Sequence, residues 1–337
     1  KGLGPSKAIE LAKVAGSPAM SKRITRQIVL QGGVGALVRC KDLSAKDGAG
    51  ANDSSKSSDE ETKKEIRNRK THSGMNEQQV EAMSFCLKKM AKDEANRGVM
   101  VQQKGIRLLS ELYNLGASLM DASGGPDSKK GMWREDCAVA LARIAISTNP
   151  QLYPQGSMLT MIRPLMWLFG DATHELHQFE AGLGLTNIAS VDEDTRDTLV
   201  MHGAWSAATN LLAADNDQVK RVGVECLSNL VMCERSIMRL RESEIDIKLF
   251  IMFAKAEDMR TKLAATGALA MMTQDHEVAK AVATQHGMKE LEDIKAKSGD
   301  PNVVTRVDMA LANIKEALEA PAARNDPRFC NGRYIGK

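Results

Sequence analysis

The sequence has few aromatic residues and almost no alternating runs of β-branched residues. Trp, Tyr and Phe together make up 4% of the 337 residues. Without alternating runs strands are not expected, and the plentiful Met and Ala suit close packing between helices. No apolar stretch reaches the length of a membrane span, and no secretory signal peptide is recognisable. We therefore expect an all-α protein that does not bind a membrane.

Catalytic motifs are absent as well. The chain contains no Cys-x-x-Cys pair, Ser-His-Asp set, Walker sequence or dinucleotide fingerprint. The glycines that begin at Gly32 lack the preceding strand and the Gly-Lys-Ser/Thr of a phosphate-binding loop. We interpret them as a turn between two helices. The expectation is a protein without enzyme activity and without a cofactor.

The cysteines and the net charge bear on the cellular compartment and on the class of partner. The six cysteines are scattered, which predicts neither a disulfide framework nor a zinc site and favours a reducing compartment such as the cytoplasm. They lie at positions 40, 86, 137, 226, 233 and 330. We expect Cys226 and Cys233 to be small core residues. The formal net charge of +3 is too small to indicate nucleic-acid binding.

One pair of histidines raises the question of a metal site. His174 and His177 are three residues apart, so they would share a helix face, and Glu175 and Glu180 are nearby. The spacing differs from His-Glu-x-x-His, because only two residues separate the histidines here. We interpret the pair as surface residues and expect no metal.

The dominant feature of the sequence is a repeat. The segment Leu185-x-Asn187-Ile188 returns three times, and positions 187, 229, 271 and 313 are each 42 residues apart. The later copies are Leu227-x-Asn229-Leu230, Leu269-x-Met271-Met272 and Leu311-x-Asn313-Ile314. A fixed period of this length is typical of a solenoid, in which each unit buries its apolar face against the next.

Polar breaks follow the same period. His202-Gly203 and His286-Gly287 are 84 residues apart, which is two periods. A Gly after a helix supplies the left-handed conformation that ends it. The Asp-containing breaks 191–194, 215–217 and 300–301 predict caps for the helices that follow.

Composition divides the chain into four parts. Residues 1–41 resemble one N-terminal repeat. Residues 42–76 are mostly Ser, Asp, Lys, Glu and Gly, which predicts a disordered linker or loop. Residues 77–320 carry the main array of repeats, and residues 321–337 form a polar tail that we expect to be flexible.

The recurring asparagine is the strongest hint of function. In a stack of like repeats Asn187, Asn229 and Asn313 would form a row, with Met271 as a gap. An Asn amide offers one acceptor and two donors, so such a row could hold an extended peptide by its main chain. The alternative is that each Asn bonds its own helix or a neighbouring turn. We favour the row, because Asn is a mediocre residue for a helix interior.

The motif Leu-x-Asn-Ile/Leu-Ala, followed by a turn, a helix and a Gly, is similar to armadillo repeats. The resemblance implies a right-handed α-solenoid whose third helices carry the Asn and line a groove. Importin-type members place a Trp four residues before the Asn. The corresponding positions in this chain are Leu183, Glu225, Gly267 and Met309, and none is a Trp, which disfavours a nuclear-import groove.

A closer resemblance is to the UCS-domain myosin chaperones. It rests on residues 140–150, 162–165, 179–190 and 226–232, of which the Phe179-Glu-Ala…Leu185-Thr-Asn187 segment is the most specific. Gly182, Gly184 and Met271 depart from the pattern. The resemblance implies that the groove binds the myosin motor domain, assists its folding and prevents its aggregation. The groove would include Asn187, Asn229, Asn313, Met271, Leu183, Glu225 and Glu180.

Two further expectations follow from the resemblance. Some family members carry an N-terminal tetratricopeptide domain for Hsp90, which makes Hsp90 a further candidate partner, although no such domain is recognisable in this chain. The alternative function is that of a general armadillo scaffold that binds a linear peptide of a partner other than myosin.

Overall fold

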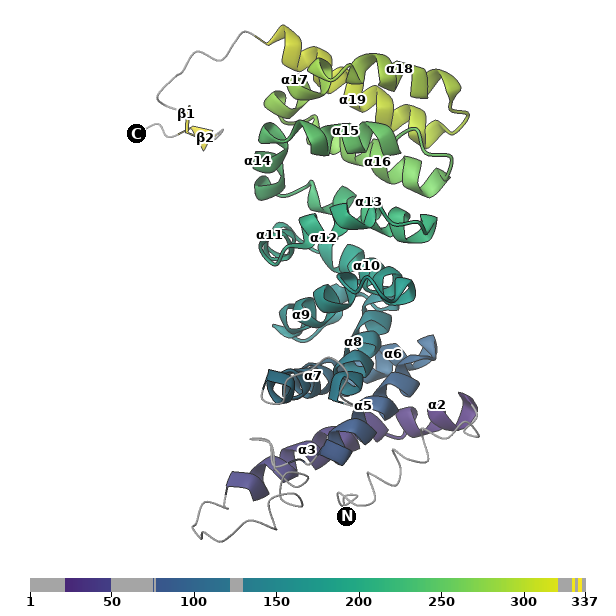
Figure 1. Ribbon diagram of the computed structural model, residues 1–337, viewed down its shortest axis with the longest axis vertical. Helices are drawn as coiled ribbons and strands as arrows, with labels where there is room; N and C mark the ends of the chain where they lie inside the picture. The colour runs from purple at the N-terminus through teal and green to yellow at the C-terminus, as the bar shows by residue number, and fades with distance from the viewer. Residues whose placement is uncertain are drawn as a thin grey trace. The chain divides into compact units, whose positions relative to one another are not determined.

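The computed structural model describes residues 22–49, 75, 77–121, 130–320, 329–330 and 333–334, and helices dominate it (Figure 1). The helices are α2 (Lys22–Leu30), α3 (Gly33–Ala49), α5 (Glu77–Ala91), α6 (Glu94–Gln102), α7 (Gly105–Asp121), α8 (Lys130–Ser147), the 3₁₀ helix η2 (Pro150–Leu152), α9 (Ser157–Phe169), α10 (Glu175–Ala189), α11 (Glu193–Met201), α12 (Ala204–Leu211), α13 (Asp217–Leu230), α14 (Glu234–Glu242), α15 (Glu244–Phe253), α16 (Met259–Met272), α17 (His276–Thr284), α18 (Gly287–Lys297) and α19 (Pro301–Glu319). A two-residue strand pair follows, β1 (Phe329–Cys330) antiparallel to β2 (Arg333–Tyr334).

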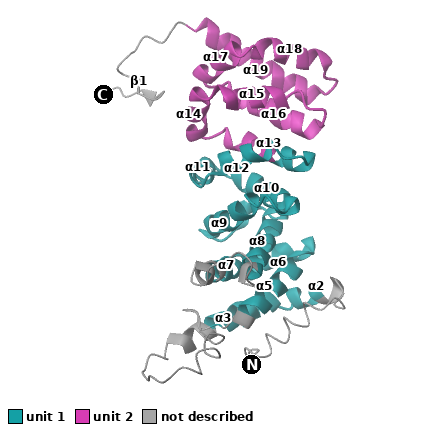
Figure 2. Cartoon of the chain, in the orientation of Figure 1, with its two compact units in different colours: residues 1–222 teal, residues 223–337 magenta. Residues whose placement is uncertain are grey.

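The chain divides into two compact units, residues 1–222 and residues 223–337, and the division falls inside α13 (Figure 2). Unit 2 contains two complete three-helix repeats. The first has helices of 9, 10 and 14 residues, α14 to α16, and the second has helices of 9, 11 and 19 residues, α17 to α19. Two shorter helices followed by a longer third helix agree with the repeat that the armadillo resemblance implies.

The predicted caps are present where the sequence breaks. Asp192 accepts a hydrogen bond from the Thr195 amide at 2.7 Å and begins α11. Asp300 accepts from the amides of Asn302 and Val303 at the start of α19. Each cap satisfies backbone N–H groups that have no partner within the helix.

The two His-Gly pairs behave differently from each other. Gly203 has a φ of +85°, as expected for a residue that ends one helix and begins the next. In the second pair the left-handed residue is His286, with a φ of +59°, and not Gly287. Gly287 is required for a different reason, because a Cβ there would lie 2.5 Å from the Val282 carbonyl oxygen. The helices α17 and α18 therefore approach too closely for any side chain at this position.

The expected boundary at residue 41 does not match the end of a helix. Helix α3 continues to Ala49, inside the segment 42–76 that we expected to be irregular, and Met75 is buried. The rest of that segment, residues 1–21 of the expected first repeat, and residues 321–328 of the expected tail lie outside the described residues.

The N-terminal helices α2 and α3 form polar contacts with the main array. The Gln103 side chain, which follows α6, accepts a hydrogen bond from the Gly35 amide at 3.1 Å and donates to the Val29 carbonyl at 2.7 Å. An ion pair between Lys41 and Glu111 joins α3 to α7. These contacts place α2 and α3 in the same unit as the repeats that follow.

Helix α10 packs too closely against its neighbours for side chains at two of its positions. A Cβ on Gly182 would lie 2.8 Å from Phe169 and from Val222, and one on Gly184 would lie 3.0 Å from the Ala145 Cβ. The two glycines that depart from the family pattern therefore permit α10 to approach its neighbours in unit 1.

Described helices lack any segment with both the length and the apolar character that crossing a bilayer requires.

Candidate functional site

The predicted groove residues lie on the third helices of their repeats. Glu180, Leu183 and Asn187 are on α10 in unit 1. In unit 2, α13 carries Glu225 and Asn229, α16 carries Met271, and α19 carries Asn313. All seven side chains are half-buried. The positions are thus equivalent within the repeat, as the 42-residue period implies.

The amide of Asn187 is engaged in the free protein. Its Nδ2 donates to the Ala145 carbonyl at 2.7 Å and to the Thr148 carbonyl at 3.2 Å. Ala145 lies at the end of α8, the third helix of the preceding repeat, where carbonyls have no partner within the helix. Asn187 therefore joins consecutive third helices by satisfying the end of the earlier one.

The same arrangement occurs at the last repeat. Nδ2 of Asn313 donates to the Ala270 carbonyl at 3.1 Å and contacts the Thr273 hydroxyl at 3.2 Å. Ala270 lies in the last turn of α16, so the acceptor is again the C-terminal end of the preceding third helix. At position 271 the Met side chain has no N–H to donate, so this connection cannot form there.

These bonds change the interpretation of the asparagine row. We expected each amide to serve a bound peptide, or else its own helix or a neighbouring turn. At Asn187 and Asn313 the donors instead serve the adjacent repeat. The sequence pattern could not reveal this, because the acceptors are backbone carbonyls 42 or 43 residues away. A role of these residues in client binding stays a prediction.

Glu180 also has a structural partner. Its carboxylate forms an ion pair with Arg143 of α8, with Nε and Oε1 3.1 Å apart and both side chains less than one-fifth exposed. The second oxygen, Oε2, is buried and has no hydrogen-bond partner. Arg97 of α6 interacts electrostatically with both Glu180 and Arg143, and burial lowers the pKa of its guanidinium. Glu180 is thus a half-satisfied carboxylate between two arginine-bearing helices.

Exposed methionines are a feature that sequence reasoning missed. Methionine is apolar and usually buried, yet seven of the described methionines are more than two-fifths exposed. They are Met132, Met201, Met232, Met238, Met252, Met259 and Met309, five of them in unit 2. Flexible, polarisable side chains of this kind can adapt to different apolar surfaces.

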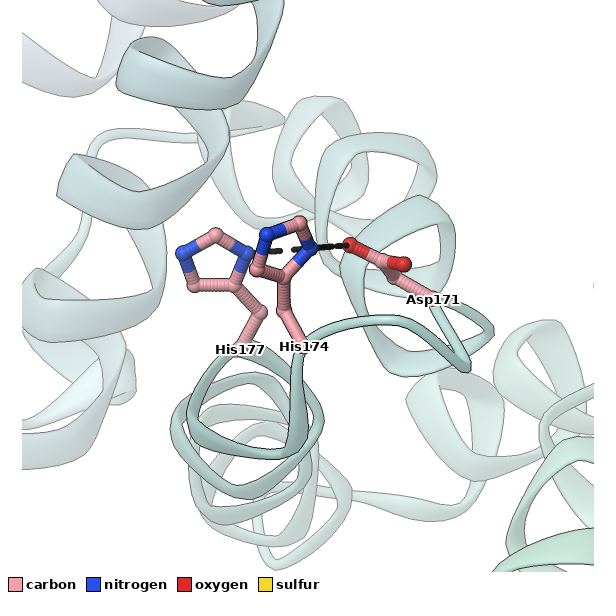
Figure 3. Close-up of side chains that lie close together, drawn as sticks. All are labelled: Asp171, His174 and His177. Atoms are coloured by element: carbon pink, nitrogen blue, oxygen red, sulfur yellow. Dashed lines mark hydrogen bonds and ion pairs between the residues drawn. The ribbon is translucent and has the colours of Figure 1, made fainter.

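The two histidines are joined by a carboxylate from the preceding turn (Figure 3). Nδ1 of His174 lies 3.0 Å from Oδ2 of Asp171, and the two imidazole centroids are 4.9 Å apart. Burial alone would raise the pKa of Asp171, but hydrogen bonds from Thr173 and His174 outweigh it and lower that pKa. The expected surface pair is in fact part of a three-residue cluster.

The fold and the repeated third-helix contacts define this protein as an armadillo-type α-solenoid. Solved designed armadillo proteins have the same fold. One of them, in complex with the peptide (KR)4, aligns with 70% of this chain and 93% of its own at a TM-score of 0.53 and 18% identity. No protein-family model matches the chain.

Within that class, the curated proteins to which the chain is similar include UNC-45 proteins. The chain is 29% identical to the unc-45 homolog B protein of Danio rerio over 201 residues, and 28% identical to that of Homo sapiens over 204. These matches cover 59% and 60% of this chain, but only 20% of each relative. The resemblance to the UCS-domain myosin chaperones is therefore confirmed, for a chain that spans about a fifth of its curated relatives.

Solved UNC-45 structures agree in fold. UNC-45 from Drosophila melanogaster aligns with 93% of this chain and 47% of its own, at a TM-score of 0.64 and 20% identity. A second structure, of an UNC-45 chaperone described as binding and folding muscle myosin, aligns with 93% of this chain and 37% of its own at 0.64 and 18% identity.

Proposed function

We propose that this chain is a myosin-directed chaperone, which binds the partly folded motor domain of a myosin heavy chain and prevents its aggregation. The observation that carries the proposal is sequence similarity to UNC-45 homolog B over about 200 residues. The related chaperone that is described as binding and folding muscle myosin has the same fold. The role is one of binding rather than catalysis.

The surface chemistry suits a partly folded client. A folding intermediate exposes apolar side chains in no fixed arrangement, so a binder gains from adaptable apolar groups of its own. The exposed methionines supply such groups on the repeats of unit 2. The half-buried Leu183, Glu225 and Asn229 would add contacts along the third helices, the surface that armadillo proteins use for binding.

The test is protection of a myosin motor fragment from heat-induced aggregation, followed by light scattering. We expect scattering to fall as the chain approaches an equimolar amount, without added ATP. An unrelated aggregation-prone protein at the same concentration is the control and should be protected less. Equal scattering of the motor fragment with and without the chain would contradict the proposal.

The alternative is an armadillo scaffold for a linear peptide of a different partner, and a pull-down from source cells separates the two. Recovery of myosin heavy chain favours the chaperone, whereas its absence with other proteins enriched favours the scaffold. Hsp90 belongs to the same proposal as a further partner and would be recovered together with myosin. A cytoplasmic location fits five buried cysteines with free thiols.

A further inference from the structure

Three potential metal ligands converge at the start of α10. The metal-binding atoms of Asp171, His174 and His177 all lie within 4.8 Å of one another. Asp171 is in the turn that follows α9, His174 is the N-cap of α10, and His177 is in its first turn (Figure 3). Among the described residues this is the one place where three such groups meet.

The state of the His177 ring is the second observation. Its Nδ1 atom is buried and has no hydrogen-bond partner, and the whole side chain is only 13% exposed. This nitrogen faces the cluster, 3.7 Å from Oδ2 of Asp171. A buried polar atom without a partner is costly, and an unfilled lone pair directed at a carboxylate and a second imidazole is what a metal ion would satisfy.

The opposite side of the same ring is already supported. Nε2 of His177 lies 3.8 Å from Oε1 of Glu135 on α8. Histidines that bind metals usually direct their second ring nitrogen at a carboxylate or carbonyl, which fixes the tautomer and strengthens the ligand. With its N–H on Nε2 facing Glu135, His177 would present the lone pair of Nδ1 to the cluster.

We propose that Asp171, His174 and His177 form a binding site for a divalent transition-metal ion, with Zn²⁺ the best match. Two imidazole nitrogens and one carboxylate oxygen are ligands that Zn²⁺ accepts, and water or a further group completes four-coordination. The set has too few oxygens for Ca²⁺ or Mg²⁺. Zinc bonds of 2.0–2.2 Å separate ligand atoms by about 3.3 Å, so small side-chain rotations close the site.

The site would act on structure rather than on chemistry. A bound ion would connect the turn before α10 to its first helical turn, and Glu135 extends the connection to α8. The helix that it fixes carries Glu180, Leu183 and Asn187. The positive end of the α10 dipole opposes a cation here, and the carboxylates of Asp171 and Glu135 offset it.

The experiment is a Zn²⁺ titration of the full chain by isothermal titration calorimetry, paired with thermal unfolding with and without Zn²⁺. We expect one equivalent to bind and to raise the Tm. His177→Ala and Asp171→Asn should each weaken binding by at least tenfold. Glu135→Gln, which keeps all three ligands, should weaken it by about ten- to hundredfold. His202→Ala is the matched control, because His202 is exposed elsewhere in unit 1 and should leave binding unchanged.

A second variant keeps the test decisive if His177→Ala disturbs folding. The His174 side chain is 57% exposed, so His174→Ala should preserve the circular dichroism spectrum while it removes the same ion. Substitution with Co²⁺ reports the ligands directly, and an absorption spectrum without thiolate charge transfer is expected. Zn²⁺ binding that is absent from the wild-type chain, unchanged in His174→Ala, or thiolate-bound in the Co²⁺ spectrum would overturn the proposal.

Discussion

At the scale of single residues, side-chain amides connect one repeat to the next. Asn187 and Asn313 donate to carbonyls at the end of the preceding third helix. A residue that recurs every 42 positions can thus recur because stacking needs it, independently of any ligand. The sequence showed which positions are equivalent, but not which of their atoms are already bonded.

The first prediction follows from those bonds. Asn187→Ala removes two hydrogen bonds and leaves the Ala145 and Thr148 carbonyls without this donor. We expect the free energy of unfolding to fall by about 1–2 kcal/mol. Thermal or urea unfolding measures the change. Asn187→Asp, which keeps the shape but has no N–H to donate, should be at least as destabilising, and a fully stable Asp variant would contradict the role of the donor.

The second prediction concerns the glycines of α10. Gly182→Ala would improve helix propensity by about 1 kcal/mol, but its Cβ would lie 2.8 Å from Phe169 and Val222. Overpacking costs about 1–3 kcal/mol, so we expect a net loss of stability in urea unfolding. Gly98→Ala is the control: Gly98 is an exposed residue of α6 with open space around it, and the substitution should stabilise by about 0.5–1 kcal/mol.

At the scale of elements, the helix caps were the most predictable feature and the loop conformations the least. Asp192 and Asp300 cap the helices that the sequence assigned to them, because a cap needs only local bonds. His286 takes the left-handed conformation that we expected of Gly287. The glycine is needed at position 287 instead because a Cβ there would clash with the Val282 carbonyl oxygen. This crowding is local, across a turn of five residues, and the His-Gly pair alone does not show which of its two residues takes the left-handed conformation.

The third prediction uses the cap of α17. Arg241 donates two hydrogen bonds to the Asp275 carboxylate, at 3.1 and 2.6 Å, and the Val278 amide donates a third. Burial alone would raise the pKa of Asp275, but these donors outweigh it and lower that pKa. The charged form is therefore favoured in the folded state.

A carboxyl group whose pKa is lowered in the folded state stabilises the fold at a pH above its unfolded-state pKa, about 3.9. That stabilisation is lost as the pH falls through the folded-state pKa. Asp275→Asn keeps a cap but removes the charge. We expect it to cost about 0.5–1 kcal/mol at pH 7, since Arg241 is 38% exposed. In urea unfolding the cost should shrink as the pH falls below the unfolded-state pKa of about 3.9, and it should vanish only below the lower, folded-state pKa of Asp275. Arg241→Gln should remove the same pH-dependent part, and a cost independent of pH would contradict the ion pair.

At the scale of the whole molecule, the 42-residue period was sufficient to predict a solenoid. Each repeat buries its apolar side against its neighbours. Buried leucines therefore recur every 42 residues, at Leu185, Leu227, Leu269 and Leu311. The three-residue cluster around His177 was not predicted. Asp171 lies outside the helix, and only the turn before α10 brings its carboxylate to the imidazoles.

The fourth prediction belongs to this scale because it concerns the binding surface. Met259 and Met309 are exposed residues of the third helices α16 and α19. Replacing both by Gln should weaken protection of the myosin motor fragment by about tenfold or more, since each apolar side chain buried by a client contributes a fraction of 1.5–3 kcal/mol. The double Met→Leu variant should retain protection. Both variants should fold, because exposed substitutions change stability by only about 0.5 kcal/mol each. Unchanged protection by the Gln variant would exclude these methionines from the binding surface.

The buried cysteines give the molecule its own set of opening reporters. Cys40, Cys86, Cys137, Cys226 and Cys233 are all buried, and burial raises the pKa of Cys86 to about 12. A thiol reagent can therefore modify each one only when the surrounding helices separate. Because α3, α5, α8 and α13 each carry one, and Cys233 precedes α14, labelling rates resolved by mass spectrometry would give a separate opening free energy around each of these helices. The unmodified chain thus reports which of these helices separates from its neighbours first.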